Sequence, residues 1–345
     1  MKEIFPGVAG NALLKERLAP KLLAGDLPHA LILEGKAGSG RRTFAREIAM
    51  AAACENRADP TLPLPCGKCE ACRKIGGDLS PDILRVARAP GKMTLGVEAV
   101  RGLRESVRAV PNDLDLKIYI IEDADTMTVQ AQNALLLTLE EPPRYVLFLL
   151  LATDATALLE TIRSRAPIYR TQPVEEREMQ EYLIAHSPEA ARLFRDAPEE
   201  AEGILRLSGG SIGEALRHIG GADRATLLQY RANAGEICRL LSGRGSPAAL
   251  LTLLLTFPQD REELAAQLGV LRLALRDLVL LSRTENAPLC FYTDRETAAE
   301  TAVRLPTSRW MRCIAATEAA ISALAANANT RLTLTGLFDR LGSAG

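Results

Sequence analysis

A glycine-rich turn between an apolar strand and a helix constrains the fold of this chain more than any other stretch. Residues 31–43 read Leu-Ile-Leu-Glu-Gly-Lys-Ala-Gly-Ser-Gly-Arg-Arg-Thr, and residues 44–50 continue as a helical pattern. A strand, a glycine-rich loop and a helix N-terminus in this order are the layout of a phosphate-binding loop. Such a loop points backbone N–H groups at an anion, and Gly35, Gly38 and Gly40 allow the close approach.

The two positions of this loop that carry the chemistry of an ATP site are altered. Gly35 and Gly40 meet the spacing of Gly-x4-Gly-Lys-Ser/Thr. Arg41 replaces the lysine, and its flat, forked guanidinium is not equivalent to a compact ammonium. Arg42 replaces the metal-binding hydroxyl, which Thr43 supplies only after a shift of one residue. We interpret the loop as a nucleotide site that has lost its chemistry, and an ATP site that uses Thr43 stays open.

The order of apolar and helical patterns predicts two kinds of architecture along the chain. Strand-like and helix-like runs alternate over residues 30–170, which predicts an α/β domain with a mainly parallel sheet. Residues 117–121 and 146–151 are near-continuous apolar runs, typical of strands buried in such a sheet. Residues 221–345 carry only helical patterns, so we predict an all-α region there. One apolar helix face in that region consists of Leu264, Leu268, Leu271, Leu275 and Leu278.

Acidic residues follow the first of the two buried strands. Glu122 and Asp123 stand at its carboxyl end, where nucleotide hydrolases hold Mg²⁺ and polarise water. The alternative is that Asp123 or Asp125 caps the next helix. Thr153 follows the second strand at the same edge of the predicted sheet. The candidate nucleotide site therefore comprises Gly35, Gly38, Gly40, Arg41, Thr43, Glu122, Asp123 and Thr153.

Length, charge and targeting signals limit the class of protein. The chain has 345 residues, enough for two or three domains, and a formal net charge of −1, which excludes a general attraction to nucleic acid. It shows no basic-then-apolar leader and no charge-free stretch of membrane-spanning length. We therefore expect a soluble, cytoplasmic protein whose seven cysteines are not a disulfide framework. The single tryptophan, Trp310, lacks aromatic neighbours and is expected to pack in a core.

Four of the seven cysteines have the spacing of a metal site. Cys54, Cys66, Cys69 and Cys72 follow the loop helix, and two of the gaps are two residues long. Four thiolates this close suit one tetrahedral Zn²⁺, and because every ligand is a protein group the site is structural. An iron–sulfur cluster lacks its usual fourth cysteine followed by proline, and the remaining alternative is four free thiols. The other cysteines lie on apolar, helix-like stretches and are expected to be core residues: Cys238, Cys290 and Cys313.

Two motifs resemble those of a known family. Residues 133–143 read Asn-Ala-Leu-Leu-Leu-Thr-Leu-Glu-Glu-Pro-Pro, which resembles a signature of clamp-loader AAA+ subunits with Leu137 in place of lysine. Residues 162–166 resemble the Ser-Arg-Cys motif of the same proteins, with Ala166 in place of cysteine. The four-cysteine insertion lies where bacterial members of the family carry a zinc module. The resemblance extends over nearly the whole chain.

The resemblance implies a three-domain organisation. A RecA-like AAA+ P-loop domain is expected over residues 1–168, with a zinc insertion at about residues 54–75. A small helical lid is expected over residues 169–221. A helical collar, through which clamp-loader subunits associate, is expected over residues 222–345, and residues 327–334 resemble the closing helix pair of the family.

Three departures distinguish this chain from the ATP-hydrolysing gamma/tau subunits of that family. Arg41 and Arg42 replace Lys-Thr, Gly213 replaces the lid arginine, and the acidic strand end reads Glu122-Asp123 instead of Asp-Glu. The resemblance therefore implies a stator of the DNA polymerase III clamp loader that binds ATP weakly or not at all. It would have no ATPase site of its own, although it would belong to a DNA-directed DNA polymerase holoenzyme. Its implied partners are the gamma/tau and delta subunits and, through the complex, the sliding clamp and primed DNA.

The resemblance also implies an arginine finger. Arg165 is expected to act in trans on the ATP of a neighbouring subunit, and Ser164 is expected to fix the turn; the alternative is a surface arginine that opposes a helix dipole. A second hypothesis is a working gamma/tau-type ATPase that uses Arg41 and Thr43. A third is a free-standing zinc-dependent DNA-binding module, against which the near-neutral charge argues.

Overall fold

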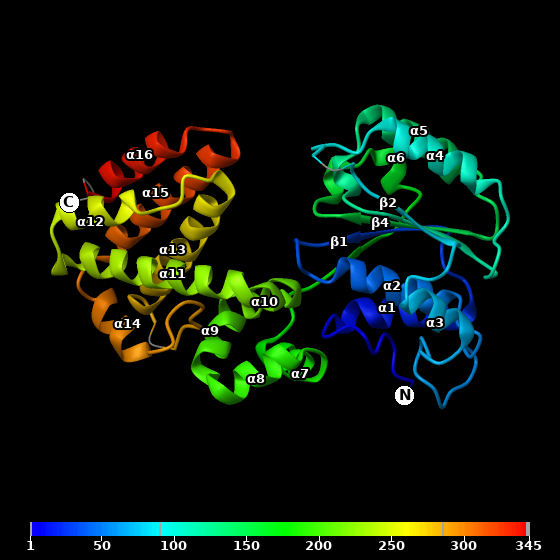
Figure 1. The fold of residues 1–345 in the computed structure, drawn as a ribbon, viewed down its shortest axis with the longest axis horizontal. Coiled ribbons are helices and arrows are strands. Elements are labelled where there is room, and N and C mark those ends of the chain that lie inside the picture. Colours follow the sequence, from blue (N-terminus) through cyan, green and yellow to red (C-terminus); the bar gives the residue numbers. More distant parts are fainter. Residues whose placement is uncertain (1, 90, 285, 343–345) are drawn as a thin grey trace. The chain divides into compact units, whose positions relative to one another are not determined.

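The computed structural model describes residues 2–89, 91–284 and 286–342 (Figure 1). Contacts within the chain divide it into two compact units. The first comprises Met1–Met179 with Gly210–Gly213, and the second comprises Gln180–Gly209 with Glu214–Gly345. The three-domain division expected from the sequence stays a prediction.

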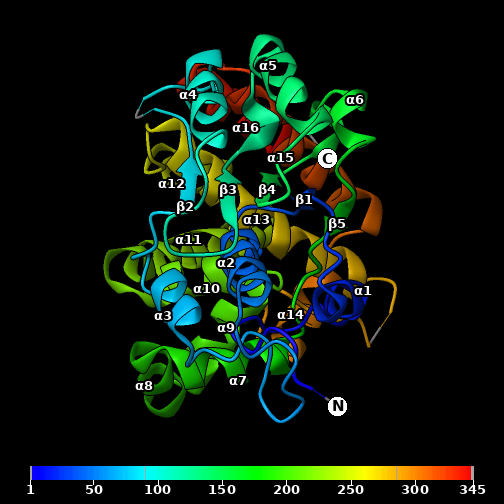
Figure 2. The same ribbon diagram turned by 90° about the vertical axis from the view of Figure 1, so that its right-hand side faces the viewer.

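A five-stranded parallel sheet forms the centre of the first unit, in the order β2-β3-β4-β1-β5 (Figure 2). The central pair is β1 with β4, in which Ala30 lies opposite Phe148 and Glu34 opposite Ala152. The predicted α/β architecture with a parallel sheet is thereby confirmed. The strands are β1 (Ala30–Glu34), β2 (Ile83–Val86), β3 (Lys117–Ile121), β4 (Val146–Ala152) and β5 (Ile168–Arg170).

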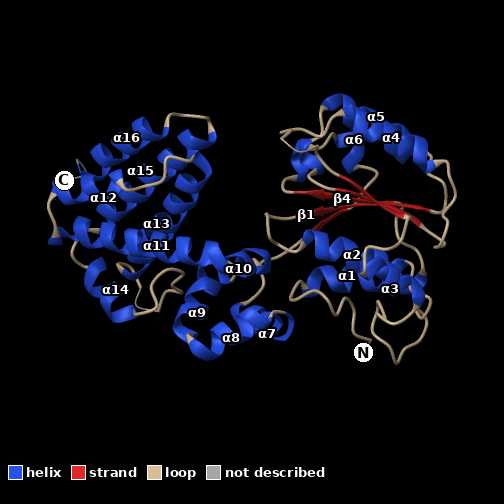
Figure 3. Cartoon of the chain, in the orientation of Figure 1, coloured by secondary structure: helices blue, strands red, loops and turns tan. Residues whose placement is uncertain are grey.

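Helices cover both faces of this sheet. Successive side chains of a strand point to opposite faces, so Leu31 and Leu33 of β1 pack in the core with α1, α2 and α3. Ala30 and Ile32 pack in a second core with α4, α5 and α6 (Figures 1 and 3). Burial on both faces explains why the strands are near-continuous apolar runs. The helices are α1 (Ala12–Ala24), α2 (Arg41–Ala52), α3 (Glu70–Gly76), α4 (Val97–Val107), α5 (Val129–Glu140) and α6 (Glu160–Arg163), with short 3₁₀ turns η1 (Ala124–Thr126) and η2 (Ala155–Ala157).

The rest of the described chain is helical, as the sequence patterns predict (Figure 3). The five leucines of the expected apolar face are all buried on α13. Trp310 is fully buried and its Nε1 donates to the Ala302 carbonyl at 3.0 Å, which confirms its packing role. Among the described residues, no helix combines the length and apolarity needed to cross a bilayer. The elements are α7 (Glu176–His186), α8 (Pro188–Asp196), α9 (Pro198–Leu207), α10 (Ile212–Ile219), α11 (Gly221–Arg239), the π-helical turn η3 (Leu240–Arg244), α12 (Pro247–Leu255), α13 (Arg261–Leu281), α14 (Arg295–Ala302), α15 (Thr307–Ala325) and α16 (Thr330–Gly342).

One expectation about the isolated cysteines is wrong. Cys238 and Cys313 are buried on α11 and α15, but Cys290 is half-buried in the loop before α14. The carboxylate of the fully buried Asp277 accepts backbone N–H bonds from residues 290, 291 and 292. These bonds hold the segment as a turn around the carboxylate, an alternative to the helical ladder that apolar spacing alone does not indicate.

Candidate functional site

The glycine loop connects the carboxyl end of β1 to the start of α2. Gly38 and Gly40 have φ angles of 74° and 84°, in the left-handed region that favours glycine. Gly35 is required for a different reason, because a Cβ there would lie 1.8 Å from the Thr171 hydroxyl oxygen. The structure therefore explains all three glycines of the sequence motif by backbone geometry or close approach.

The two arginines that replace the lysine and the hydroxyl lie at the start of α2. Arg42 Nη2 lies 2.5 Å from the Glu122 carboxylate, whose side chain is 12% exposed. The guanidinium of Arg42, whose side chain is 71% exposed, therefore covers the carboxylate that the sequence assigns to Mg²⁺ and neutralises its charge. Arg41 is half-buried, and burial lowers the pKa of its guanidinium while the charges of Asp125 and Asp123 oppose the shift. Arg41 Nη1 is buried without a hydrogen-bond partner among the described residues.

The second acidic residue also contacts an arginine. Asp123 Oδ2 accepts bonds from Arg88 Nε at 3.2 Å and from Nη2 at 2.9 Å. The alternative role as a helix cap is not seen for either aspartate: Asp123 makes no side-chain cap bond, and Thr128 caps α5. Asp125 instead accepts the backbone N–H of Thr153 at 3.1 Å, which joins the ends of β3 and β4.

The structure brings the candidate nucleotide residues to the carboxyl edge of the sheet, but not into one bonded cluster. Thr43 is on the first turn of α2 and has no hydrogen bond to Glu122 or Asp123 in the described part of the chain. Thr153 contributes its backbone and not its hydroxyl. Sequence reasoning missed Arg88 altogether, because it lies in a loop whose proximity to Asp123 depends on the pairing of β2 with β3.

A segment near the start of α10 contacts the glycine loop. The Gly213 N–H donates to the Gly38 carbonyl at 3.1 Å, and a Cβ on Gly213 would lie 2.9 Å from the Gly38 Cα. The Ser39 hydroxyl also accepts a bond from Thr171 Oγ1 at 2.9 Å. The loop is therefore fastened from two sides, and residue 213 has no space for the arginine that the resemblance expects there in an ATPase subunit.

Substitution of Gly213 by alanine tests this close approach. We expect Gly213→Ala to destabilise the first unit by about 1–3 kcal/mol, the range for overpacking a close contact. Gly102, in the middle of α4, is the matched control, because its Cβ would meet nothing within 4 Å. Gly102→Ala is expected to stabilise the unit by about 0.5–1 kcal/mol. Urea unfolding followed by circular dichroism checks both signs, and equal effects of the two variants would contradict the contact.

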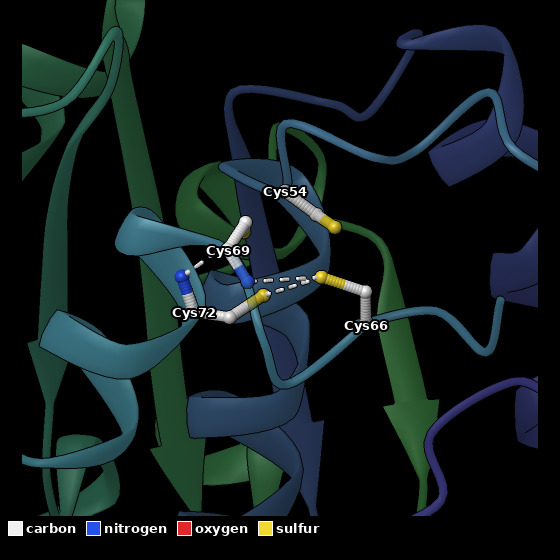
Figure 4. Close-up of side chains that lie close together, drawn as sticks. All are labelled: Cys54, Cys66, Cys69 and Cys72. Carbon is white, nitrogen blue, oxygen red and sulfur yellow. Dashed lines mark hydrogen bonds between the residues drawn. The ribbon is translucent and has the colours of Figure 1, made fainter.

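The four clustered cysteines lie close together and are buried, around the loop at residues 66–69 that leads into α3 (Figure 4). Their sulfur atoms all lie within 4.8 Å of one another, and Cys66 Sγ is 3.9 Å from Cys72 Sγ. Sulfurs around a tetrahedral Zn²⁺ with bonds of about 2.3 Å are separated by about 3.8 Å. The four thiols therefore form a possible metal site whose donors and spacing fit zinc.

Backbone and side-chain donors support this cysteine cluster. The N–H of Cys69 points to Cys66 Sγ and the N–H of Cys72 to Cys69 Sγ, each at 3.4 Å, and Asn56 Nδ2 donates to Cys66 Sγ at 3.5 Å. Burial raises the pKa of the Cys72 and Cys54 thiols. Burial also acts to raise the pKa of Cys66, but the N–H donors around its sulfur outweigh it and lower that pKa to about 6. A bound cation is the charge that would favour four thiolates together.

Arg165 and Ser164 lie in the turn after α6, before the amino end of β5. The Ser164 hydroxyl donates to the Thr161 carbonyl at 3.0 Å. Arg165 Nη1 donates to the same carbonyl at 3.0 Å, and Nη2 contacts Glu140 Oε1 at 3.0 Å. The arginine is thus away from the glycine loop, which follows the carboxyl end of β1 in the same parallel sheet.

The sheet, the glycine loop and the acidic strand end define a P-loop α/β protein in which arginines contact the acidic residues. A sequence model of the family described as "DNA polymerase III, delta subunit" matches residues 10–175. The DNA polymerase III subunit delta' of Escherichia coli is 32% identical over 263 residues, which cover 73% of this chain and 76% of that protein. The chain therefore belongs to the clamp-loader AAA+ family of DNA polymerase III subunits.

The chain is also similar to a tau subunit and to a solved structure. The DNA polymerase III subunit tau of Escherichia coli is 33% identical over 212 residues, which cover 59% of this chain. The match covers 32% of that protein, so the chain spans about a third of the length of the tau subunit. A solved gamma subunit-related protein of Thermotoga maritima aligns over 95% of this chain and 98% of its own, with 16% identity and a TM-score of 0.44.

Proposed function

We propose that this chain is a delta-prime-type stator of the DNA polymerase III clamp loader and does not hydrolyse ATP itself. The observation that carries the proposal is the contact between Arg42 and Glu122. A guanidinium stands where a hydrolase needs a hydroxyl and a metal ion, and it neutralises the carboxylate that would help to hold that ion. The close contact of Gly213 with Gly38 supports the same assignment, because an ATPase subunit would carry the lid arginine there.

In this role the chain would act on its partners and not on its own nucleotide. Its partners would be the gamma/tau and delta subunits and, through the assembled complex, the sliding clamp and primed DNA. Arg165 would reach the ATP of the adjacent gamma/tau subunit, with Ser164 holding the turn. The match to the Escherichia coli delta' subunit is compatible with this choice, and the substitutions at Arg41, Arg42 and Gly213 favour it over a gamma/tau subunit.

The three-domain organisation is part of the proposal. Residues 1–168 would form the RecA-like AAA+ domain, with a structural Zn²⁺ on Cys54, Cys66, Cys69 and Cys72 in the insertion at about residues 54–75. Residues 169–221 would form the lid and residues 222–345 the collar.

A titration of the purified chain with ATP tests the proposal. We expect no magnesium-dependent hydrolysis and no gain in ATP affinity when Mg²⁺ is added, because Glu122 already contacts Arg42. Calorimetry with and without Mg²⁺, together with phosphate release, measures both quantities. A gamma/tau subunit with an intact Gly-Lys-Thr loop is the positive control. Turnover of Mg–ATP by this chain alone would contradict the stator and favour the gamma/tau-type alternative.

A further inference from the structure

The guanidinium of Arg165 is held from two sides before any partner is present. Nη1 donates to the Thr161 carbonyl and Nη2 contacts Glu140 Oε1, both at 3.0 Å. A guanidinium has five N–H donors, and these two bonds use two of them. The side chain stays 35% exposed. Arg165 is therefore oriented and still presents donors to an incoming anion.

The position of Glu140 is unfavourable for a carboxylate on its own. Glu140 is the last residue of α5, where the negative end of the helix dipole disfavours an acidic side chain. Its side chain is 48% exposed, and an ion pair this open to solvent contributes little to stability. The main effect of the contact is therefore to orient the guanidinium of Arg165, which the backbone carbonyl of Thr161 holds at a second point.

We propose that Glu140 is a positioning residue for Arg165, an inference that rests on the proposed action of Arg165 in trans. Fixing a long side chain costs rotamer freedom. A guanidinium that is already oriented does not bear that cost when charge develops on the transferred phosphoryl group. Glu140 touches neither nucleotide nor metal in this role and acts only through Arg165.

The test uses a clamp loader reconstituted with this chain and its gamma/tau and delta partners. The partner ATPase sites that do not face Arg165 are inactivated at their P-loop lysines, so that single-turnover hydrolysis reports one site. We expect Glu140→Gln to lower the single-turnover rate constant at saturating ATP about 10- to 100-fold, with the ATP concentration for half-maximal rate and complex assembly unchanged. Glu141→Gln is the matched control, because no ion pair of the exposed Glu141 is found among the described residues.

A double variant separates positioning from a general structural role. We expect Glu140→Gln combined with Arg165→Ala to be no slower than Arg165→Ala alone, because the glutamate acts only through the arginine. An unchanged single-turnover rate constant for Glu140→Gln, or a further loss in the double variant, would overturn the positioning role. If Arg165→Ala alone left the rate unchanged, the action in trans would fail first, and the positioning role would fail with it.

Discussion

Replacing Arg165 with alanine is expected to slow ATP hydrolysis about 1,000-fold at the site of the adjacent subunit, the low end of the effect of an arginine finger. This corresponds to about 4 kcal/mol of lost transition-state stabilisation. The physical reason is that a guanidinium beside the γ-phosphate neutralises charge that develops during phosphoryl transfer. Arg165 needs no nucleotide of its own for this, so the altered loop at Arg41 and Arg42 is compatible with the role.

Single-turnover hydrolysis in the reconstituted loader measures this effect. Arg165→Lys keeps the positive charge but loses the forked donor geometry, so an intermediate loss is expected. Arg163→Ala is the matched control, since Arg163 lies two residues away and its Nε donates to the Leu158 carbonyl within the same turn. A rate for Arg165→Ala that equals that of Arg163→Ala would show that Arg165 is an ordinary surface residue.

The helices and strands could be predicted from the sequence because they depend on local patterns of apolar and polar residues. The apolar run at residues 117–121 predicts β3 with its observed bounds, and the run at residues 146–151 predicts β4 to within one residue. The cysteine cluster follows from spacing as well, since Cys66, Cys69 and Cys72 lie on one tight knuckle and the start of a helix. Short-range geometry therefore determined these predictions.

The interactions among the candidate nucleotide residues, at the carboxyl edge of the sheet, could not be predicted from the sequence in the same way. Arg42 is visible in the sequence as a substitution, but its contact with Glu122 depends on the packing of α2 against β4 and β1, which follow β3 in the sheet. The contact between Gly213 and Gly38 joins positions far apart in the chain. Both need tertiary placement of side chains or backbone that no pattern of hydrophobicity encodes. The pattern Gly-Arg-Arg indicates that the phosphate-binding loop has lost its ATP-site residues, and the structure shows that the Arg42 guanidinium contacts Glu122 there.

Loss of Zn²⁺ from the four-cysteine site is the second change for which we expect a large effect, in this case on stability. We expect the purified chain to carry one Zn²⁺ and to lose it when Cys72 is replaced by serine, because Cys72 Sγ lies among the other three sulfurs. Structural zinc binding contributes about 10–16 kcal/mol in small zinc modules. Part of that stabilisation is expected here, since the cysteine cluster adjoins α2 and α3 in the core of the first unit. The melting temperature should therefore fall in the variant and after chelation.

Metal analysis and thermal unfolding on the same samples measure zinc content and stability together. Cys290→Ser is the matched control, because Cys290 is a half-buried cysteine outside the cluster and should leave the zinc content at one per chain. Chelation should lower the melting temperature of the wild type and of Cys290→Ser, and leave Cys72→Ser unchanged, since that variant has no metal to lose. A wild-type chain prepared with added zinc that binds none would contradict the metal site, and so would a Cys72→Ser variant that retains a full equivalent.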